Sequence, residues 1–296
     1  MVHISVCICT FKRAAMLKRL LETLERQQTG GQFTFSIVVA DNDAARSAEP
    51  VVATFAADSP IQTLYRSQPL KNIALTRNAA LAAASGDFIA FIDDDEFPAD
   101  EWLALLLATC AKHEVAGVLG PVRPHFESPP PTWITKGRFC ERPVHPTGMI
   151  LQSSQCRTGN VLFRRKIIAD LAEPFRPEFG TGGEDVDFFQ RMIGQGRVFV
   201  WCEEAAAYET VPPSRWTRRY MLERALLRGQ INLKMKGTRT KSLLTSAIAV
   251  PLYSIVLPFT LLAGQHVFMN YSIRFCDHLG RVLALLGINP VRERAM

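Results

Sequence analysis

The chain has 296 residues, of which 48% are hydrophobic and 21% are charged, and its formal net charge is +6. This size and composition fit one large globular domain, or a domain with an appendage, built on a sizeable core. The positive charge is concentrated in residues 215–241, which hold nine Lys or Arg against one Glu. A nucleic-acid-binding protein usually spreads basic residues over its binding face, so the pattern argues against that class and favours an anionic membrane surface.

The N-terminal residues and the cysteines both indicate a protein of a reducing compartment. Lys12 and Arg13 follow an apolar, strand-like run without a cleavage site, so we expect no signal peptide. The seven cysteines include neither a C-x-x-C pair nor the Cys/His spacing of a zinc site. Cys7 and Cys9 share one face of an expected strand, which predicts buried packing instead of a metal or redox role.

The first 120 residues alternate between strand and helix patterns. The apolar residues predict strands at 2–9, 33–40, 87–92 and 115–119, and helices at 14–28, 74–84 and about 99–112. This alternation predicts a mostly parallel sheet with helices on both faces. The first three strands each end in polar residues, as expected where a ligand binds beyond the carboxyl ends of a parallel sheet.

The pattern changes after residue 120. Residues 121–148 contain seven prolines, which favour an ordered excursion or a mobile loop over the site and disfavour a regular element. Regular patterns resume near 157–165 and continue with a helix at about 184–194, a strand at 197–202 and a helix at about 215–235.

Residues 242–273 contain no Asp, Glu, Lys or Arg. Within them, 243–263 is almost wholly apolar and long enough to cross a bilayer, which needs about 20 residues. Pro251 and Pro258 would kink such a helix, so a re-entrant or interface-lying segment fits as well as a full span. A buried core helix or a dimer contact is the remaining alternative.

Asp93, Asp94 and Asp95 directly follow the apolar strand 87–92. Three consecutive carboxylates repel one another unless cations or hydrogen-bond donors offset their charge. The end of a strand is where an open α/β sheet binds ligands, and Mg²⁺ is typically held by one or two carboxylates together with substrate phosphates. A solvated acidic loop is the alternative for this run taken alone.

Other element ends carry residues suited to a nucleotide. Thr10, Phe11 and Arg13 follow the first strand and offer a hydroxyl, an aromatic face and a cation. Asp41 ends the second strand and can accept hydrogen bonds from a base, while Arg77 can reach a diphosphate with its planar donor fork. Taken singly, these features are also a helix cap, a turn residue and a surface ion-pair partner. Glycine-rich phosphate-binding motifs are absent, so metal and arginine would hold the phosphates.

The run from Gly180 to Asp185, Gly-Thr-Gly-Gly-Glu-Asp, is a second strong signal. Glycines allow a ligand to approach the backbone closely, and Glu184 and Asp185 open a predicted helix where the helix dipole favours negative charge. The run is therefore either helix-capping chemistry or the position of a general base that deprotonates an acceptor hydroxyl.

Together these segments resemble the family 2 glycosyltransferases with the GT-A fold, over roughly residues 1–210. The order and spacing of the segments carry the resemblance, because each one alone is weak. Within the family, the chain is most similar to bacterial exopolysaccharide enzymes of the succinoglycan-biosynthesis type. The matching segments are Cys7–Arg13, Val38–Asp43, Asn72-Ile73, Arg77–Ala80, Ser85–Glu96, Gly120–Arg123, Gly159–Val161, Gly182–Phe189 and Glu209–Pro212.

The resemblance implies an α/β protein with a Rossmann-like, mostly parallel central sheet and an inverting transfer by a single displacement. The donor would be a UDP-sugar, most simply a UDP-hexose such as UDP-glucose. The acceptor would be a hydroxyl of a lipid-linked or saccharide molecule in bacterial polysaccharide or glycoconjugate biosynthesis. Mn²⁺ or Mg²⁺ would be the cofactor.

The same resemblance implies a role for each candidate residue. In the nucleotide site, Asp41 would bind uracil, Asp94 would contact ribose, and Arg77 would support the phosphates. The complete set of expected donor-nucleotide residues is Thr10, Phe11, Arg13, Asp41, Asp43, Arg77, Asp93 and Asp94.

Two further pairs of acids complete the expected site. Asp95, with Asp93 near it, would bind the metal that bridges the diphosphate, and Asp185 would be the catalytic base with Glu184 beside it. The chain departs from many relatives in one respect, because Tyr208 stands where a His would join the metal shell. This departure puts a side-chain metal ligand from that loop in doubt, and Glu209 is a weak candidate to replace it.

These observations predict three segments. Residues 1–212 would form the GT-A catalytic domain, 213–241 a basic amphipathic helical segment, and 242–296 apolar helices that are membrane-associated or transmembrane. The basic belt beside an apolar segment predicts a place on the cytoplasmic face of the bacterial inner membrane, peripheral or anchored.

Two rival interpretations come from other functional classes. A metal-dependent nucleotidyltransferase or phosphatase acting on sugar phosphates would also use aspartates after strands, but the Glu184-Asp185 motif argues against it. A non-catalytic membrane-bound scaffold with a degenerate transferase domain is suggested only by the missing His, and the intact acids oppose it.

Overall fold

The computed structural model describes the backbone of residues 1–234, 239–288 and 291, and the side chains of these residues except 232–234 and 239–242. The chain forms two compact units. Unit 1 comprises Met1–Arg123 and Arg142–Thr210, and unit 2 comprises Pro124–Glu141 and Val211–Met296.

A seven-stranded sheet is the centre of unit 1, with the strand order β3-β2-β1-β4-β8-β6-β9. Strand β8 pairs antiparallel with both β4 and β6, and the other recorded pairs are parallel, which confirms the predicted mostly parallel sheet. The strands are β1 Val2–Thr10, β2 Phe33–Asp41, β3 Thr63–Ser67, β4 Phe88–Ile92, β6 Gly117–Leu119, β8 Asn160–Arg164 and β9 Phe199–Trp201.

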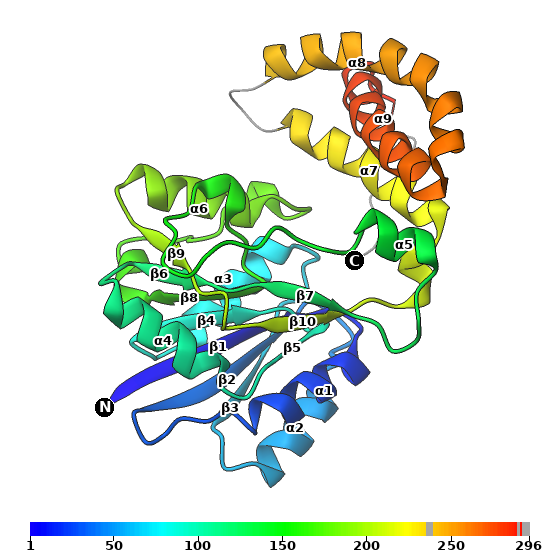
Figure 1. Ribbon diagram of the computed structural model, residues 1–296. Helices are drawn as coiled ribbons and strands as arrows, with labels where there is room; N and C mark the ends of the chain where they lie inside the picture. The colour runs from blue at the N-terminus through cyan, green and yellow to red at the C-terminus, as the bar shows by residue number, and fades with distance from the viewer. Residues whose placement is uncertain (235–238, 289–290, 292–296) are drawn as a thin grey trace. The chain divides into compact units, whose positions relative to one another are not determined.

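Alternate residues of the central strands supply two separate cores, one on each face of the sheet. In β1, Ile4, Val6 and Ile8 pack with helices α1 and α4, whereas Cys7 packs with α3 and α6. Successive side chains of a strand point to opposite faces, so one apolar run can serve both layers. Figure 1 shows the helices on both sides of the sheet. The helices are α1 Ala14–Leu24, α2 Glu49–Asp58, α3 Ile73–Ala83, α4 Trp102–Lys112 and α6 Glu184–Gly194.

Helix α2 and strand β3 were not anticipated from the sequence. Val52 is the one residue of α2 that is buried, so the helix lacks a broad apolar stripe. Strand β3 lies at the edge of the sheet, and each of its residues keeps some exposure to solvent. Both elements therefore lack the apolar periodicity that identifies their neighbours.

The prediction that residues 121–148 contain no regular element is wrong. This stretch includes strand β7 Val122–His125 and helix α5 Thr132–Gly137. Strand β7 lies at the edge of a three-stranded sheet, with β10 Ala207–Thr210 in the centre and β5 Glu96–Pro98 at the other edge. An edge strand tolerates Pro124, and Pro131 stands just before α5, so these prolines are compatible with regular structure.

Unit 2 is helical. Its core combines Ile134 of α5 with Val211, Trp216, Met221 and Met269. Its long helices are α7 Arg218–Lys234, α8 Arg239–Thr260 and α9 Gln265–Leu285, with short 3-10 turns at Pro213–Trp216 and Leu261–Ala263. The predicted helix at about 215–235 corresponds to α7, but residues 235–238 and the side chains of 232–242, which belong to the predicted basic segment, lie outside the described residues.

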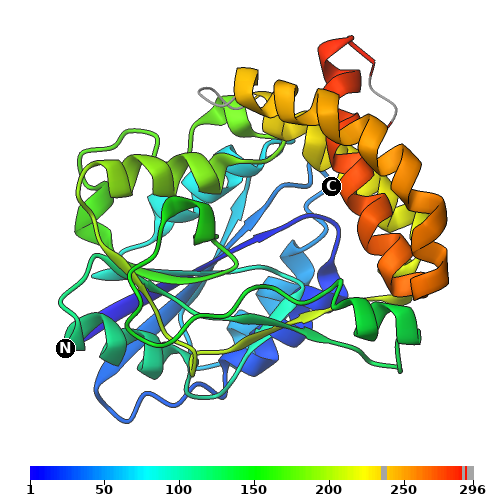
Figure 2. The same ribbon diagram turned by 45° about the horizontal axis from the view of Figure 1, so that its top comes forward.

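Helix α8 runs through Pro251 and Pro258, and it is bent beside α9 in both ribbon views (Figures 1 and 2). Among the described residues, the stretch Leu243–Ala263 alone combines the length and the apolar composition needed to cross a membrane. The structure places most of this stretch at the surface, with 11% of the apolar window buried. The alternative of a core helix buried within this chain is therefore wrong, and the alternative of a dimer contact is not tested.

Cys7 and Cys9 are free thiols. Cys7 is fully buried and Cys9 is half-buried, and both pack into the core between the sheet and α3 and α6. Burial raises the pKa of the Cys9 thiol to about 12, which disfavours a reactive thiolate. The packing role expected for this pair is confirmed.

Candidate active site

Three neighbouring parallel strands bring the predicted nucleotide residues to one edge of the large sheet. Strand β1 lies between β2 and β4. Thr10 at the end of β1 is in register with Asp41 at the end of β2, and Asp93 directly follows β4. This edge is formed by the carboxyl ends of the strands, where ligands bind in open α/β sheets.

Asp94 is held by the segment that follows β1. The Thr10 hydroxyl donates to Asp94 Oδ2 at 2.8 Å, and Arg13 Nη1 donates to Asp94 Oδ1 at 2.8 Å and to Asp95 Oδ2 at 3.2 Å. Burial raises the pKa of Asp94 to about 6, although the Arg13 guanidinium opposes the shift. Arg13, whose side chain is 40% exposed, therefore neutralises part of the charge of two adjacent carboxylates.

Six carboxylates face three arginines at this edge. Each guanidinium lies between two carboxylates: Arg13 between Asp94 and Asp95, Arg77 between Asp93 and Glu184, and Arg142 between Glu96 and Glu209. Among the side chains that the structure describes, this cluster has twice as many acidic as basic groups. Protons or a cation can supply the remaining positive charge.

Arg77 is a buried bridge between two of the predicted motifs. It lies on α3, and its Nη1 contacts Glu184 Oε1 at the start of α6 while its Nη2 is 3.8 Å from Asp93 Oδ1. The guanidinium also lies over the ring of Phe175, 5.7 Å from its centroid. The Arg77 side chain is 8% exposed, so the link that it forms between the acid run and the Gly-Gly-Glu-Asp motif is buried.

Glu96 is the most deeply buried acid of the cluster. Its Oε2 accepts the backbone N–H of Asp93 at 3.2 Å, and its Oε1 has no hydrogen-bond partner. Burial, followed by repulsion from Asp93, raises the pKa of Glu96 well above its ordinary value. Space beside Glu96 depends on Gly159, because a Cβ there would lie 2.8 Å from Glu96 Oε1 and 3.2 Å from Asp93 Oδ2.

Asp41 is fully buried and already has three hydrogen-bond donors. Its Oδ1 accepts the N–H of Asp43 at 2.9 Å, and its Oδ2 accepts the N–H of Ala48 at 2.9 Å and the Tyr65 hydroxyl at 3.0 Å. Burial raises the pKa of Tyr65 to about 12, and its hydrogen bond to Asp41 adds to this shift. These three hydrogen bonds fix the position of the Asp41 carboxylate. Two of the donors bind Oδ2 and one binds Oδ1.

Phe11 directly follows β1, and Asp43 lies two residues after the end of β2. The Phe11 ring is half-buried, and the ammonium groups of Lys12 and Lys71 lie 5.2 Å and 5.6 Å from its centroid. Asp43 is buried, and its Oδ1 accepts the N–H of Ala45 at 3.2 Å. An aromatic face with two nearby cations suits a base with an attached phosphate chain.

The two acids that open α6 differ in accessibility. Gly183 precedes the helix with φ of +93°, a conformation that favours glycine. Glu184 is buried against Arg77, whereas Asp185 is half-exposed and accepts the N–H of Val186 at 2.8 Å. Asp185 is therefore the acid of this pair that a substrate can reach.

Tyr208 and Glu209 point to opposite faces of β10. The Tyr208 ring stacks on Phe97 with 5.5 Å between the centroids, and Glu209 Oε2 accepts a hydrogen bond from Arg142 Nη2 at 2.5 Å. Since alternate residues of a strand face opposite sides, Tyr208 is directed away from the acid cluster and Glu209 toward it. Of the two residues, Glu209 is therefore the one that joins the acid cluster.

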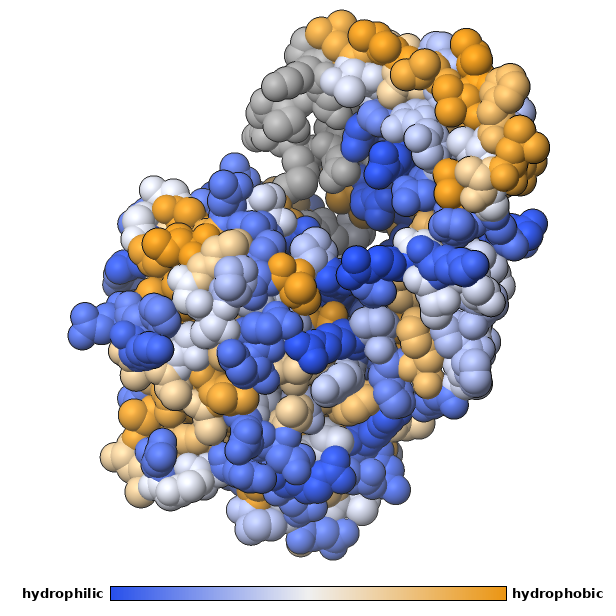
Figure 3. Space-filling model, in the orientation of Figure 1, coloured by the Kyte–Doolittle hydropathy of each residue, from blue (hydrophilic) through white to orange (hydrophobic). Residues whose placement is uncertain are grey.

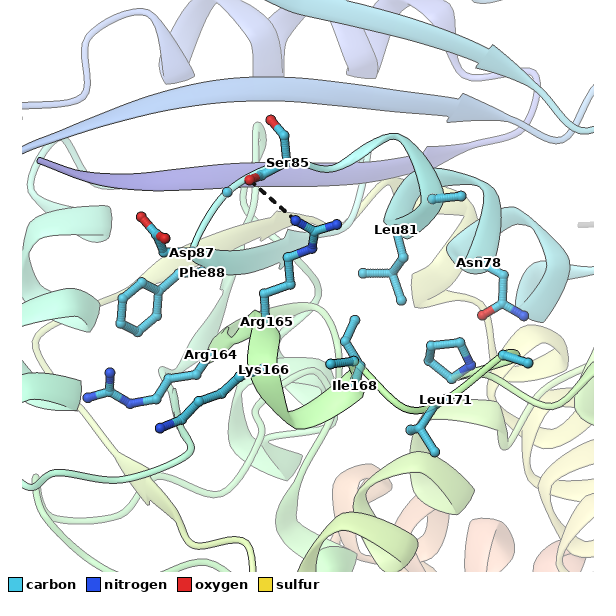
Figure 4. A pocket seen from close by; sticks show the side chains of 15 residues that line it. Asn78, Leu81, Ser85, Asp87, Phe88, Arg164, Arg165, Lys166, Ile168 and Leu171 are labelled. Carbon is cyan, nitrogen blue, oxygen red and sulfur yellow. Dashed lines mark hydrogen bonds between the residues drawn. The ribbon is translucent and has the colours of Figure 1, made fainter.

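Two cavities of unit 1 lie at opposite edges of the sheet. A cavity of about 360 Å³ opens at the carboxyl edge, and its lining includes Arg142, His145, Arg157, Asn160 and Trp201. A larger cavity of about 650 Å³ lies at the other edge, beside the start of β4 (Figure 4). The acids and the nucleotide residues lie at the first edge, which identifies it as the candidate active site.

The donor set at this edge fits a hard divalent cation. Over the described residues, no three His, Cys, Asp or Glu side chains form a ready-made metal site. Asp93 and Asp95 nevertheless supply carboxylate oxygens in a cluster with an excess of negative charge. A cation held by one or two carboxylates and completed by substrate phosphates needs no third protein ligand.

Two residues of this cluster, Glu96 and Arg142, were not predicted from the sequence. Glu96 follows the acid run, but its burial depends on β10 pairing with β5, a contact between residues more than a hundred positions apart. Arg142 lies in the proline-rich stretch and has no local pattern. The adjacency of Glu96 to Asp95 was the one signal in the sequence for either residue.

The fold and the acidic sheet edge define a nucleotide-sugar transferase of the GT-A class. The chain belongs to glycosyl transferase family 2, whose family model matches residues 5–171. It is 31% identical to the succinoglycan biosynthesis protein ExoM of Rhizobium meliloti (strain 1021) over 98% of this chain and 95% of ExoM. It is also 26% identical to chondroitin synthase of Escherichia coli, over 72% of this chain and 35% of that protein.

Solved structures support the same fold. The mannosyltransferase PcManGT of Pyrobaculum calidifontis, in complex with GDP-Man and Mn²⁺, superposes with a TM-score of 0.65 at 16% identity, over 97% of this chain and 88% of that one. TarS 1–349 of S. aureus, in complex with UDP, gives a TM-score of 0.56 at 17% identity, over 97% and 93% of the two chains. The predicted family and the predicted GT-A fold are confirmed.

Proposed function

We propose that this glycosyltransferase moves a hexose, such as glucose, from a UDP-sugar to a hydroxyl of a lipid-linked or saccharide acceptor during bacterial exopolysaccharide biosynthesis. One observation carries the proposal: Thr10, Asp41 and the acid run Asp93–Asp95 lie at one edge of the sheet. Asp185 lies at the start of α6, and Arg77 links this helix to the acid run through its contacts with Glu184 and Asp93. The similarity to ExoM over nearly the whole chain supports the biosynthetic setting.

The donor side of the proposal rests on the residues around β1, β2 and β4. Asp41 and Asp43, with Thr10 and Phe11, would bind the uracil, and Asp94 the ribose. TarS has been crystallised with UDP and with UDP-GlcNAc, which supports a uridine nucleotide for a chain of this fold. Arg13 lies beside Asp94 and Asp95 and is exposed enough to approach the diphosphate.

Asp95, with Asp93, would hold Mn²⁺ or Mg²⁺. The bound cation would offset the charge of the departing nucleoside diphosphate. The Mn²⁺ in the PcManGT complex supports this choice of cofactor class. Arg77 would stabilise this metal site, because its guanidinium lies near Asp93 and also contacts Glu184.

Asp185 would act as the base. Its half-exposed carboxylate would accept the proton of the acceptor hydroxyl as the oxygen attacks the anomeric carbon from the face opposite the leaving group. One displacement inverts the configuration at that carbon, so an α-linked donor yields a β-linkage. Glu184 would contribute by fixing the start of α6 through Arg77.

A donor screen tests this proposal. Purified full-length protein is incubated with several sugar nucleotides and Mn²⁺, with and without lipid-linked acceptor, and nucleoside diphosphate release is measured. We expect release with at least one UDP-hexose and its loss on chelation. Absence of release with every donor, in the presence of lipid-linked and saccharide acceptors, would overturn the proposal.

The proposal also places the protein at the cytoplasmic face of the bacterial inner membrane. Nine basic residues between 215 and 241 and the exposed apolar stretch Leu243–Ala263 support this location. Fractionation checks it: the protein should sediment with inner membranes after lysis without detergent, and recovery in the soluble fraction at low salt would contradict it.

A further inference from the structure

Helix α8 carries a row of large apolar side chains that the described part of unit 2 leaves exposed. Five large side chains recur at intervals of three or four residues and are between 56% and 72% exposed: Leu244, Ile248, Leu252, Ile255 and Phe259. Residues at this spacing lie on one face of a helix, so they form a continuous row, named here the α8 stripe. Leu261 and Leu262, in the 3-10 turn that follows α8, are also exposed, at 57% and 91%.

Three polar side chains of α8, Ser246, Tyr253 and Thr260, lie on its less exposed side, and α8 packs along α9. Ser246 is fully buried and its hydroxyl lies 3.0 Å from His278 Nδ1. Tyr253 packs against Tyr271 and His278, each with 5.9 Å between the ring centroids. Thr260, seven residues further on, is 8% exposed. A soluble amphipathic helix buries its large apolar side chains, whereas α8 exposes a row of five of them.

Figure 3 shows the consequence at the surface of unit 2, where hydrophobic residues gather over α8. A contiguous exposed apolar face of this length marks a site of contact with protein or lipid. We propose that the α8 stripe is a monotopic membrane-binding surface: α8 lies in the plane of an anionic bilayer, with the stripe inserted among the acyl chains.

Charged residues on the neighbouring helix argue for this orientation and against a membrane span. Helix α9 packs along α8 and carries Arg274, Asp277 and Arg281. Asp277 is paired with Arg228 of α7, whose side chain is 51% exposed. A spanning α8 would draw these charges into the hydrocarbon, where ionised groups are costly. An α8 in the plane of the interface leaves them on the side of the headgroups and water.

Charge also favours lipid over a second copy of the chain. The stripe itself contains no charged residue, and the basic residues of 215–241 directly precede it. Anionic headgroups attract such a belt, and apolar insertion with basic flanks is the usual composition of an interfacial helix. Two copies joined through the stripe would instead bring two basic belts together.

This inference refines the membrane location given under the proposed function, on which it rests for the choice of a bacterial lipid mixture. Binding of lipid requires no sugar transfer, so the membrane-binding proposal and the transferase proposal can fail separately.

Purified full-length protein is floated with vesicles of phosphatidylethanolamine and phosphatidylglycerol. The double variant Ile248→Asn/Ile255→Asn tests the stripe, and Ile150→Asn in unit 1 is the matched control, because Ile150 and Ile248 are 68% and 72% exposed.

We expect the double variant to lower the vesicle partition coefficient by about ten-fold or more, and the control to remain within about two-fold of the wild type. Equal binding by all three proteins would overturn the proposal. So would a wild-type dimer in solution that the double variant dissociates without any change in vesicle binding, since the stripe would then join two copies.

A depth measurement separates an in-plane helix from a span. Nitroxide labels are attached to Leu244→Cys and Leu252→Cys, and their depths in the bilayer are compared after subtraction of the wild-type background. The two positions are eight residues apart, or about 12 Å along a helix. We expect equal depths. Depths that differ by most of this distance would show a span and overturn the proposal.

Discussion

Arg77 and Glu184 form an ion pair inside unit 1, with only 8% and 6% of their side chains exposed. The pair joins the middle of α3 to the first residue of α6. It is asymmetric, because Arg77 also lies 3.8 Å from Asp93, whereas the other oxygen of Glu184 has no hydrogen-bond partner. One guanidinium therefore links the Glu-Asp motif to the acid run.

Loss of Arg77 should destabilise the protein more than loss of Glu184. Arg77→Met leaves two carboxylates without their cation and should lower the free energy of unfolding by about 3–5 kcal/mol. Glu184→Leu leaves Arg77 with Asp93 and should cost less. The double variant should recover part of the stability lost in Arg77→Met, since it also removes the buried Glu184 carboxylate that has lost its cation. Urea unfolding of the four proteins measures this coupling, and additive single effects would contradict it.

Asp185→Asn should separate donor binding from transfer. The substitution keeps the size of the side chain but removes the proton acceptor, so UDP-sugar binding should persist while turnover falls by at least about a hundred-fold. Binding is measured by calorimetry and turnover by UDP release. Asp170→Asn, at an exposed position away from the sheet edge, is the control and should retain both. Normal transfer by Asp185→Asn would rule out the assigned base.

The parts of the fold that could be predicted are those encoded by local apolar patterns. Strands β1, β2 and β4 are buried on both faces, so each can be recognised in the sequence as an apolar run with a polar end. These strands place Thr10, Asp41 and Asp93 at one edge of the sheet. Helix α2 has one buried residue and β3 is an exposed edge strand, so neither has a pattern to read.

The rest of the site depends on contacts between distant parts of the chain. Glu96 enters the cluster because β5 pairs with β10, and Arg142 reaches Glu209 from the proline-rich stretch. Tyr208 could be recognised from the sequence as a departure from the family pattern. Which of residues 208 and 209 faces the acids follows only from the register of β10, where Glu209 lies opposite Glu96.

Removal of the metal and removal of Asp95 should have the same effect on donor binding. Asp95→Ala deletes a carboxylate proposed to hold the cation, and it should weaken Mn²⁺-dependent UDP binding by at least about ten-fold. Wild-type protein treated with EDTA should bind UDP as weakly as the variant. Asp58→Ala, an exposed aspartate at the end of α2, serves as the control. Calorimetry with and without Mn²⁺ measures both, and metal-dependent binding retained by Asp95→Ala would contradict the assignment.

Gly159→Ala should weaken the metal site without removing a carboxylate. The added methyl group would lie 2.8 Å from Glu96 Oε1 and 3.2 Å from Asp93 Oδ2, so at least one of these acids must move. Glu96 is fully enclosed, so the displacement should fall mainly on Asp93, whose side chain is 43% exposed. We expect the apparent affinity for Mn²⁺ in UDP binding to fall by about three- to ten-fold, which is less than the effect of deleting Asp95.

Gly194→Ala provides the matched control for this prediction. Gly194 ends α6, and a Cβ at this position would meet no atom within 4 Å, so the substitution adds the same methyl group where there is space. It should leave Mn²⁺ affinity unchanged and keep or slightly raise the melting temperature. If Gly159→Ala also left the Mn²⁺ affinity unchanged, Asp93 would not need its present position to hold the cation, and Asp95 alone would remain as the proposed carboxylate ligand.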